Sequence, residues 1–157
     1  MKPLLVLACL VMAPLLSGAS SAPPEALVRP VEYTVDGREY VDLELVLAVD
    51  VSSSIDEVEA RRQREGHVAA LADPEVISAI QGGGYGRIAV IYLEWADGDF
   101  QRVVAPWTVI ATEADARIFA ASLATAPFIS GRRTAIGAAI DSSITLIEDN
   151  AYEGIRQ

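Results

Sequence analysis

One carboxylate and two hydroxyls stand at alternate positions in the segment that contains Asp50, Ser52 and Ser54. Their hard oxygen atoms suit Mg²⁺ or Mn²⁺ better than zinc. The segment directly follows the aliphatic run of residues 45–49, which predicts a strand buried on both faces, as in a parallel sheet. Open α/β sheets bind ligands at the C-terminal ends of such strands. The spacing therefore predicts a cation-binding loop at the end of a central strand.

A second loop is needed to close such a site, and residues 130–134 are the best candidate. This loop contains Gly131 and ends on Thr134, which precedes a helix predicted over residues 134–149. The threonine hydroxyl would then lie at the N-terminus of that helix. We expect Thr134 to join the three oxygen ligands of the first loop.

Strands and helices alternate along the rest of the chain, which predicts a βαβ architecture with a largely parallel sheet. A hairpin is expected first, because Asp36 and Gly37 form a favoured hairpin turn. Strands are then expected over residues 43–49, 87–95 and 100–110, the last interrupted at Pro106, and helices over residues 54–72, 75–80, 113–124 and 134–149. A further strand is expected after the last helix, so the chain is expected to be a fragment or an unusually short domain.

The N-terminus has the features of a secretory signal peptide over residues 1–22. Lys2 precedes the apolar stretch of residues 4–16, and small residues follow it. The stretch is shorter than the roughly 20 apolar residues of an ordinary membrane span. We therefore expect an exported protein, periplasmic or secreted, with no stable membrane span after cleavage. Residues 23–41 would form a linker and short hairpin, and residues 42–157 the main domain.

Composition narrows the partners that can be expected. The chain has 157 residues, a formal net charge of −10 and one cysteine, Cys9, inside the predicted signal peptide. An acidic exported domain is a poor candidate for nucleic-acid binding, which needs basic patches. A cleaved chain would also lack any thiol for a disulfide or a cysteine-ligated metal.

The two loops together resemble the metal-ion-dependent adhesion site of von Willebrand factor A domains. That pattern is Asp-x-Ser-x-Ser after the first strand, a threonine on a second loop and an aspartate on a third. Asp50, Ser52 and Ser54 match the first element and Thr134 fits the second, whereas no residue is assigned to the third. The resemblance extends over residues 42–157 and is closest to a bacterial exported A-domain-like family of unknown function. It is carried by residues 46–52, 63–66, 85–90 and 94–95.

This resemblance implies an α/β fold of the Rossmann-like, doubly wound kind, with a mostly parallel sheet flanked by helices and its C-terminal strands missing. It implies an adhesion-type binding domain and not an enzyme. Mg²⁺ or Mn²⁺ would be bound by Ser52, Ser54 and Thr134, with Asp50 acting partly through water. The remaining coordination position would accept a carboxylate from a protein partner.

Simpler interpretations remain open for both loops. Ser54 and Glu57 have capping-box spacing, so the first loop could serve only to begin a helix. Thr134 could likewise be only an N-cap. A metal-dependent hydrolase on the same fold class is one alternative function, but His67, the only histidine, is expected on a helix surface and not as a base. The other alternative is a degenerate domain that binds no metal and serves in assembly.

Overall fold

The computed structural model describes residues 34–35 and 37–157, so the expected signal peptide and residues 23–33 of the expected linker lie outside the described residues. Glu32–Gln157 form one compact unit. Its elements are β1 (Thr34–Val35), β2 (Arg38–Val41), β3 (Leu43–Asp50), α1 (Glu57–Leu71), α2 (Pro74–Gln81), β4 (Ile88–Trp95), β5 (Gln101–Ile110), α3 (Glu113–Thr125), α4 (Ile136–Glu148) and β6 (Tyr152–Gly154). Within this described part, no helix combines the length and apolar character needed to cross a membrane.

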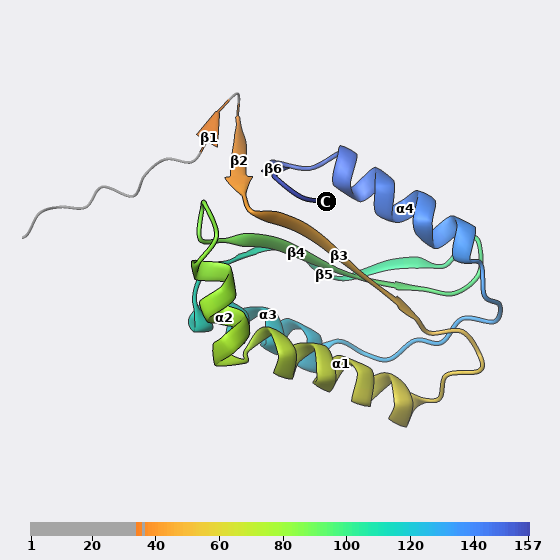
Figure 1. Ribbon diagram of the computed structural model, residues 1–157. Helices are drawn as coiled ribbons and strands as arrows, with labels where there is room; N and C mark the ends of the chain where they lie inside the picture. Colours follow the sequence, from red (N-terminus) through yellow and green to blue (C-terminus); the bar gives the residue numbers. More distant parts are fainter. Residues whose placement is uncertain (1–33, 36) are drawn as a thin grey trace, which may run out of the picture. The chain divides into compact units, whose positions relative to one another are not determined.

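The main sheet has the strand order β3-β4-β5. β3 and β4 are parallel, with Leu43 opposite Ile88 and Asp50 opposite Trp95, and α1 and α2 form the crossover between them. β5 returns antiparallel to β4. In Figure 1, α1, α2 and α3 cover one face of the sheet and α4 lies over the other. The predicted α/β class is thus confirmed, with a mixed sheet in which β3 and β4 form the parallel pair.

β4 is the strand that the fold buries completely, whereas β3 is only partly buried. All eight residues of β4 are buried, because helices cover both faces and a strand flanks each edge. In β3, Val49 is buried but Ala48 is exposed. The expectation that residues 45–49 are buried on both faces is therefore wrong. The physical reason is that β3 pairs along its length only with β4, so its other edge lacks a strand among the described residues.

β5 is one continuous strand, but its pairing with β4 is irregular at the expected interruption, because Pro106 has no partner in the register. The strand pairs only with β4, and an edge strand tolerates a proline because the missing N–H faces away from the ladder. The register shifts between Val90 and Tyr92, where the chain absorbs the irregularity as a bulge.

A second, smaller sheet has the order β1-β2-β6. The predicted hairpin is present, with Gly37 in the left-handed conformation at a φ of 84°. The short strand β6 follows the last helix and runs parallel to β2, so it does not extend the main sheet. Glu44 of β3 binds this end of the chain, because its carboxylate accepts hydrogen bonds from Asn150 Nδ2 at 2.6 Å and from the Gly154 N–H at 2.7 Å. The hairpin therefore packs in the same compact unit as the main sheet.

The helix starts follow local capping, with one correction. α1 begins after Asp56, whose Oδ1 accepts a 2.8 Å hydrogen bond from the Glu59 N–H. Ser54 is therefore not the cap. α3, expected over residues 113–124, begins with a capping box of Thr112 and Asp115. Burial would raise the pKa of Asp115, but hydrogen bonds from Thr112 and from the backbone outweigh it and hold that pKa below its ordinary value.

The core lies mainly between the sheet and the α1–α3 layer, where Tyr92, Phe119 and Leu123 are fully buried. α4 contributes far less, since Ala139 is its one buried residue. The helix predicted over residues 134–149 is present as α4, but its isoleucines contribute little to the core. Ile136, Ile140 and Ile144 are 60%, 55% and 49% exposed. The α4 face of β3 is consequently the open side of the fold.

Candidate metal centre

The first loop of the candidate centre begins where β3 ends. Asp50 is the last residue of β3, and its Oδ1 accepts a 2.7 Å hydrogen bond from the Ser52 N–H. The Oγ atoms of Ser52 and Ser54 lie 3.2 Å apart. Ser52 is buried, Asp50 half-buried and Ser54 exposed. The loop therefore draws the three predicted oxygen-bearing side chains together at the C-terminal edge of the sheet.

The spacing of the two hydroxyls fits a small divalent cation. Adjacent oxygen ligands of an octahedral Mg²⁺ lie about 3.0 Å apart, given metal–oxygen distances of about 2.1 Å. The observed 3.2 Å between Ser52 Oγ and Ser54 Oγ is close to this value. Because Asp56 caps α1, the hydroxyl of Ser54 is not needed for the helix start. In the described chain no group of three or more His, Cys, Asp and Glu could hold a metal, so an ion here would depend on hydroxyl ligands.

The predicted second loop of residues 130–134 is part of the whole α3–α4 connection, residues 126–135, which is called the second loop from here on and lies directly against the first. The Gly131 N–H donates a 2.9 Å hydrogen bond to the Val51 carbonyl. In return, Ser53 Oγ donates to the Arg132 carbonyl at 3.0 Å. The Ser53 bond joins residues 79 positions apart in the sequence, and together the two bonds hold the loops against each other. The predicted pairing of the two loops is thus present in the fold.

Thr134 is exposed on the second loop, shortly before α4 begins. The loop is anchored next to it by a 2.7 Å hydrogen bond from the Ala135 N–H to the Ala96 carbonyl. Ala135 is the N-cap of α4 and no side chain caps this helix, so the N-cap interpretation of Thr134 is wrong. Within the described residues no hydrogen bond joins Thr134 to the three side chains of the first loop. The fold brings its loop to the centre and leaves its hydroxyl uncommitted.

Gly131 permits the close approach of the second loop to Ala96, directly after β4. A Cβ built at this position would lie 2.1 Å from the Cβ of Ala96, far inside van der Waals contact. We expect Gly131→Ala to displace the second loop and to lower the free energy of unfolding by about 1–3 kcal/mol, measured by urea denaturation.

Gly137→Ala is the matched control for this substitution. Gly137 lies in the first turn of α4, and a Cβ there would meet nothing within 4 Å. This change should raise the free energy of unfolding by roughly 0.5–1 kcal/mol, because alanine favours the helix. An unchanged stability of Gly131→Ala would contradict the close packing of the second loop against Ala96.

A buried ion cluster lies behind the second loop, and no sequence motif had indicated it. Glu94 in β4 is 1% exposed. Its Oε1 accepts hydrogen bonds from Arg64 Nε at 2.9 Å and Nη2 at 2.5 Å, and its Oε2 accepts from Arg102 Nη2 at 2.5 Å. The available signal was Glu94 itself, an acidic residue in an otherwise apolar strand. A charge in a buried strand requires a partner, and the partners come from α1 and β5.

His67 is half-buried and not on the helix surface as expected. Its Nδ1 lies 3.3 Å from Tyr92 Oη, and the two rings meet edge to face. Burial lowers the pKa of His67 below its ordinary value. His67 and Asp50 border the same open cavity along the free edge of β3, but no hydrogen bond joins them within the described part of the chain. His67 is thus engaged with the core.

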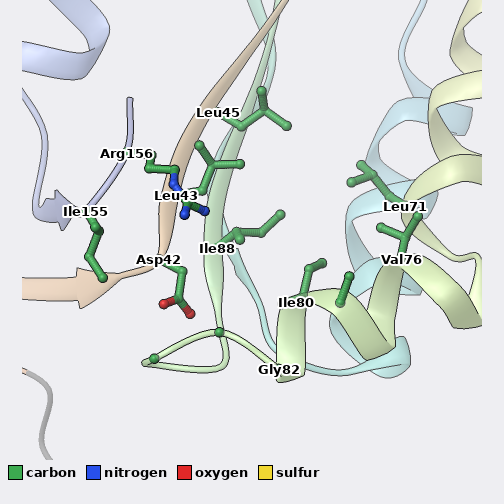
Figure 2. Close-up of a pocket in the computed structure, with 13 residues that line it drawn as sticks. Asp42, Leu43, Leu45, Leu71, Val76, Ile80, Gly82, Ile88, Ile155 and Arg156 are labelled. Carbon is green, nitrogen blue, oxygen red and sulfur yellow. The ribbon is translucent and has the colours of Figure 1, made fainter.

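A cavity of about 630 Å³ lies at the opposite end of β3 from the candidate centre. Figure 2 shows its mainly apolar lining, which includes Leu43, Leu45 and Ile80. Its carboxylate, Asp42, accepts backbone hydrogen bonds from Tyr85 at 3.1 Å and from Arg87. Burial would raise the pKa of Asp42, but these bonds hold it below its ordinary value. The Asp42 carboxylate is thus engaged by the backbone of the loop that leads into β4, and the cavity lining contains none of the four proposed metal ligands.

A family model described as "Protein of unknown function (DUF1194)" matches residues 40–157. The chain belongs to the DUF1194 family. No curated protein matches the chain. The DUF1194 chain is similar to the vWF domain of the type V pili tip protein Mfa5 from Porphyromonas gingivalis, with 11% sequence identity and a TM-score of 0.43. This similarity covers 70% of the DUF1194 chain and 34% of the pilus protein, so the chain spans about a third of that protein's length.

Proposed function

We propose that this domain is an exported protein-binding module, which binds a divalent cation through Asp50, Ser52, Ser54 and Thr134. The observation that carries the proposal is the first loop, in which Asp50 holds the Ser52 backbone and the two serine hydroxyls lie 3.2 Å apart. Mg²⁺ or Mn²⁺ would be the ion, because each ligand is a hard oxygen.

The charge balance of the site favours an acidic partner. Asp50 is the one carboxylate among the four proposed ligands, so a bound divalent cation would keep net positive charge. Arg132 and Arg133 are exposed on the second loop and add positive charge in a chain whose net charge is −10. When bound, the ion would supply an electrostatic bridge to a carboxylate of a partner protein. The residues of this chain would hold the ion and leave one coordination position open.

The geometry gives less support to the alternatives. A metal-dependent hydrolase would need a general acid or base beside the ion, and the imidazole of His67 contacts Tyr92 instead. A degenerate assembly domain would need no hydroxyl cluster at the end of β3. Turnover of a phosphatase or esterase substrate by the Mn²⁺-loaded protein would favour the hydrolase and contradict the binding module.

The proposal is tested by titrating Mn²⁺ and Mg²⁺ into the protein by isothermal calorimetry. We expect one ion per chain, and an affinity about tenfold lower in Thr134→Ala because one oxygen ligand is lost. Thr145→Ala is the matched control, since Thr145 is exposed on α4 away from both loops. The absence of ion binding in the unmodified protein would refute the proposal.

A further inference from the structure

We infer that Arg64, Glu94 and Arg102, named here the arginine–glutamate cluster, position the second loop of the candidate metal centre. The inference rests on the proposed function in one respect, because the loop concerned is the one that carries Thr134. These residues touch neither loop's oxygen ligands, so they are positioning residues.

The cluster binds the start of the second loop directly. Arg64 Nη1 donates a 2.7 Å hydrogen bond to the carbonyl of Ala126, and Arg64 Nη2 donates to the carbonyl of Pro127 at 3.2 Å. Arg102 Nη2 donates to the same Pro127 carbonyl at 2.9 Å. Two arginines from different elements therefore converge on two consecutive carbonyls, while Glu94 holds both guanidinium groups in place.

The end of α3 explains why the loop needs this support. α3 ends at Thr125, and Ala126 turns directly into an extended conformation, with φ −70° and ψ 132°. The last turn of α3 has no basic residue of its own. Carbonyl groups at a helix C-terminus lack intrahelical donors and favour nearby cations. Arg64 and Arg102 supply both the donors and the charge at this helix end.

Stability alone does not account for a cluster of two buried charged groups and a third that is half-buried. Replacing a buried ion cluster by well-packed apolar residues is often neutral or stabilising, so such a cluster is weak evidence for a stabilising role. Apolar side chains could not donate the four directed N–H···O hydrogen bonds that Arg64 makes. The planar guanidinium of Arg64 uses Nε, Nη1 and Nη2 at once, on Glu94 and on the loop.

The C-terminal end of β4 consequently holds both ends of the second loop. Glu94 holds its beginning through the two arginines, and the Ala96 carbonyl holds its end through the Ala135 N–H at 2.7 Å. The Gly131 N–H is fixed in between on the Val51 carbonyl at 2.9 Å. Loss of the arginine hydrogen bonds to the start of the loop should therefore increase the motion of the loop without increasing that of the core.

Hydrogen exchange of single amides tests the inference without any metal. In Arg64→Lys a single ammonium replaces three donor nitrogens. We expect the amides of Gly131 and Ala135 to exchange at least tenfold faster, relative to the core amide of Val90, than in the unmodified protein. Unchanged relative protection of the Gly131 and Ala135 amides would overturn the inference.

Two further variants keep the test decisive. Ile110→Ala creates a cavity in the core without touching the loop, so it should accelerate exchange at all protected amides by a similar factor. Arg102→Lys should loosen the loop less than Arg64→Lys, because Arg102 uses one nitrogen for both of its acceptors. The inference would be contradicted if Ile110→Ala accelerated exchange of the loop amides, relative to the amide of Val90, as strongly as Arg64→Lys does.

Mn²⁺ titration of the same variants separates this inference from the proposed function. We expect at least a fivefold loss of affinity in Arg64→Lys and less than a twofold loss in Ile110→Ala. If the unmodified protein binds no Mn²⁺, the proposed function fails, and the exchange rates still decide whether the cluster positions the loop.

Discussion

Replacing Asp50 by alanine should reduce the affinity for Mn²⁺ or Mg²⁺ at least a hundredfold, the largest effect expected at the candidate centre. Asp50 is the one charged group among the proposed ligands, and the hydroxyls of Ser52, Ser54 and Thr134 are neutral. Two unit charges 4 Å apart near a protein surface attract by about 4 kcal/mol, and a divalent ion is attracted more strongly. Even a water-mediated contact of Asp50 with the ion would therefore contribute more than 100-fold to binding.

Asp50→Asn separates this charge from the structural role of the side chain. The carboxylate also accepts the 2.7 Å hydrogen bond from the Ser52 N–H, which an asparagine carbonyl can retain. We expect Asp50→Asn to keep the loop and still lose the ion, as judged by calorimetry and by the shift of the unfolding temperature on adding Mn²⁺. A ligand at 100 times its dissociation constant stabilises a protein by about 2.7 kcal/mol, and this gain should vanish in both variants.

Asp99→Asn is the matched control for charge. Asp99 is an exposed acid in the turn after β4 and has no place in the proposed ligand set. Its loss changes the net charge by the same amount, so it should leave the affinity for Mn²⁺ within about twofold. Equal affinities in Asp50→Asn and the unmodified protein would remove Asp50 from the site.

Glu94→Ala should lower the free energy of unfolding by about 3–5 kcal/mol, the largest stability effect expected in this chain. The substitution would leave the guanidinium groups of Arg64 and Arg102 partly or fully buried without a counter-charge, since their side chains are 10% and 25% exposed. A loss of this size is a large share of the 5–15 kcal/mol that holds an ordinary domain together. Urea denaturation followed by circular dichroism measures it.

Glu57→Ala provides the matched control on the surface. Glu57 and Arg61 form an i,i+4 ion pair on α1, with side chains 56% and 65% exposed. Such a pair contributes only about 0–1 kcal/mol, because water screens it and both side chains lose freedom. A cost below 1 kcal/mol for Glu94→Ala, similar to that of Glu57→Ala, would show that the buried cluster is not what holds β4, α1 and β5 together.

Most of the elements could be predicted because their signals are local. The aliphatic runs of β3 and β4 and the capping box of Thr112 and Asp115 each lie within a few residues of one another, and the structure has all three. Where two local signals competed, the sequence was ambiguous. Ser54 and Asp56 both suit a helix N-cap, and Asp56 caps α1 while the Ser54 hydroxyl contacts Ser52.

Burial was predicted less well than secondary structure. A run of aliphatic residues indicates a strand, but not how many strands or helices cover it. β4 lies between two strands and two helical layers and is fully buried, whereas the similar run of β3 lies at an edge. The isoleucines of α4 repeat at helical spacing, and yet Ile136, Ile140 and Ile144 are exposed, because the sheet face beneath them is open.

The sequence by itself determined the chemistry of the first loop, since Asp50, Ser52 and Ser54 need only the turn that follows β3 to bring their oxygen atoms together. The sequence also indicated the loop that faces them, but only the tertiary structure decided which contacts hold and support that loop. The bond from Gly131 to Val51 and the pairing of Arg64 with Glu94 join residues far apart in the chain. Such contacts depend on the parallel register of β3 and β4 and on the packing of α1 and β5 around them. No spacing along the chain encodes that packing, because it exists only when the whole sheet has formed.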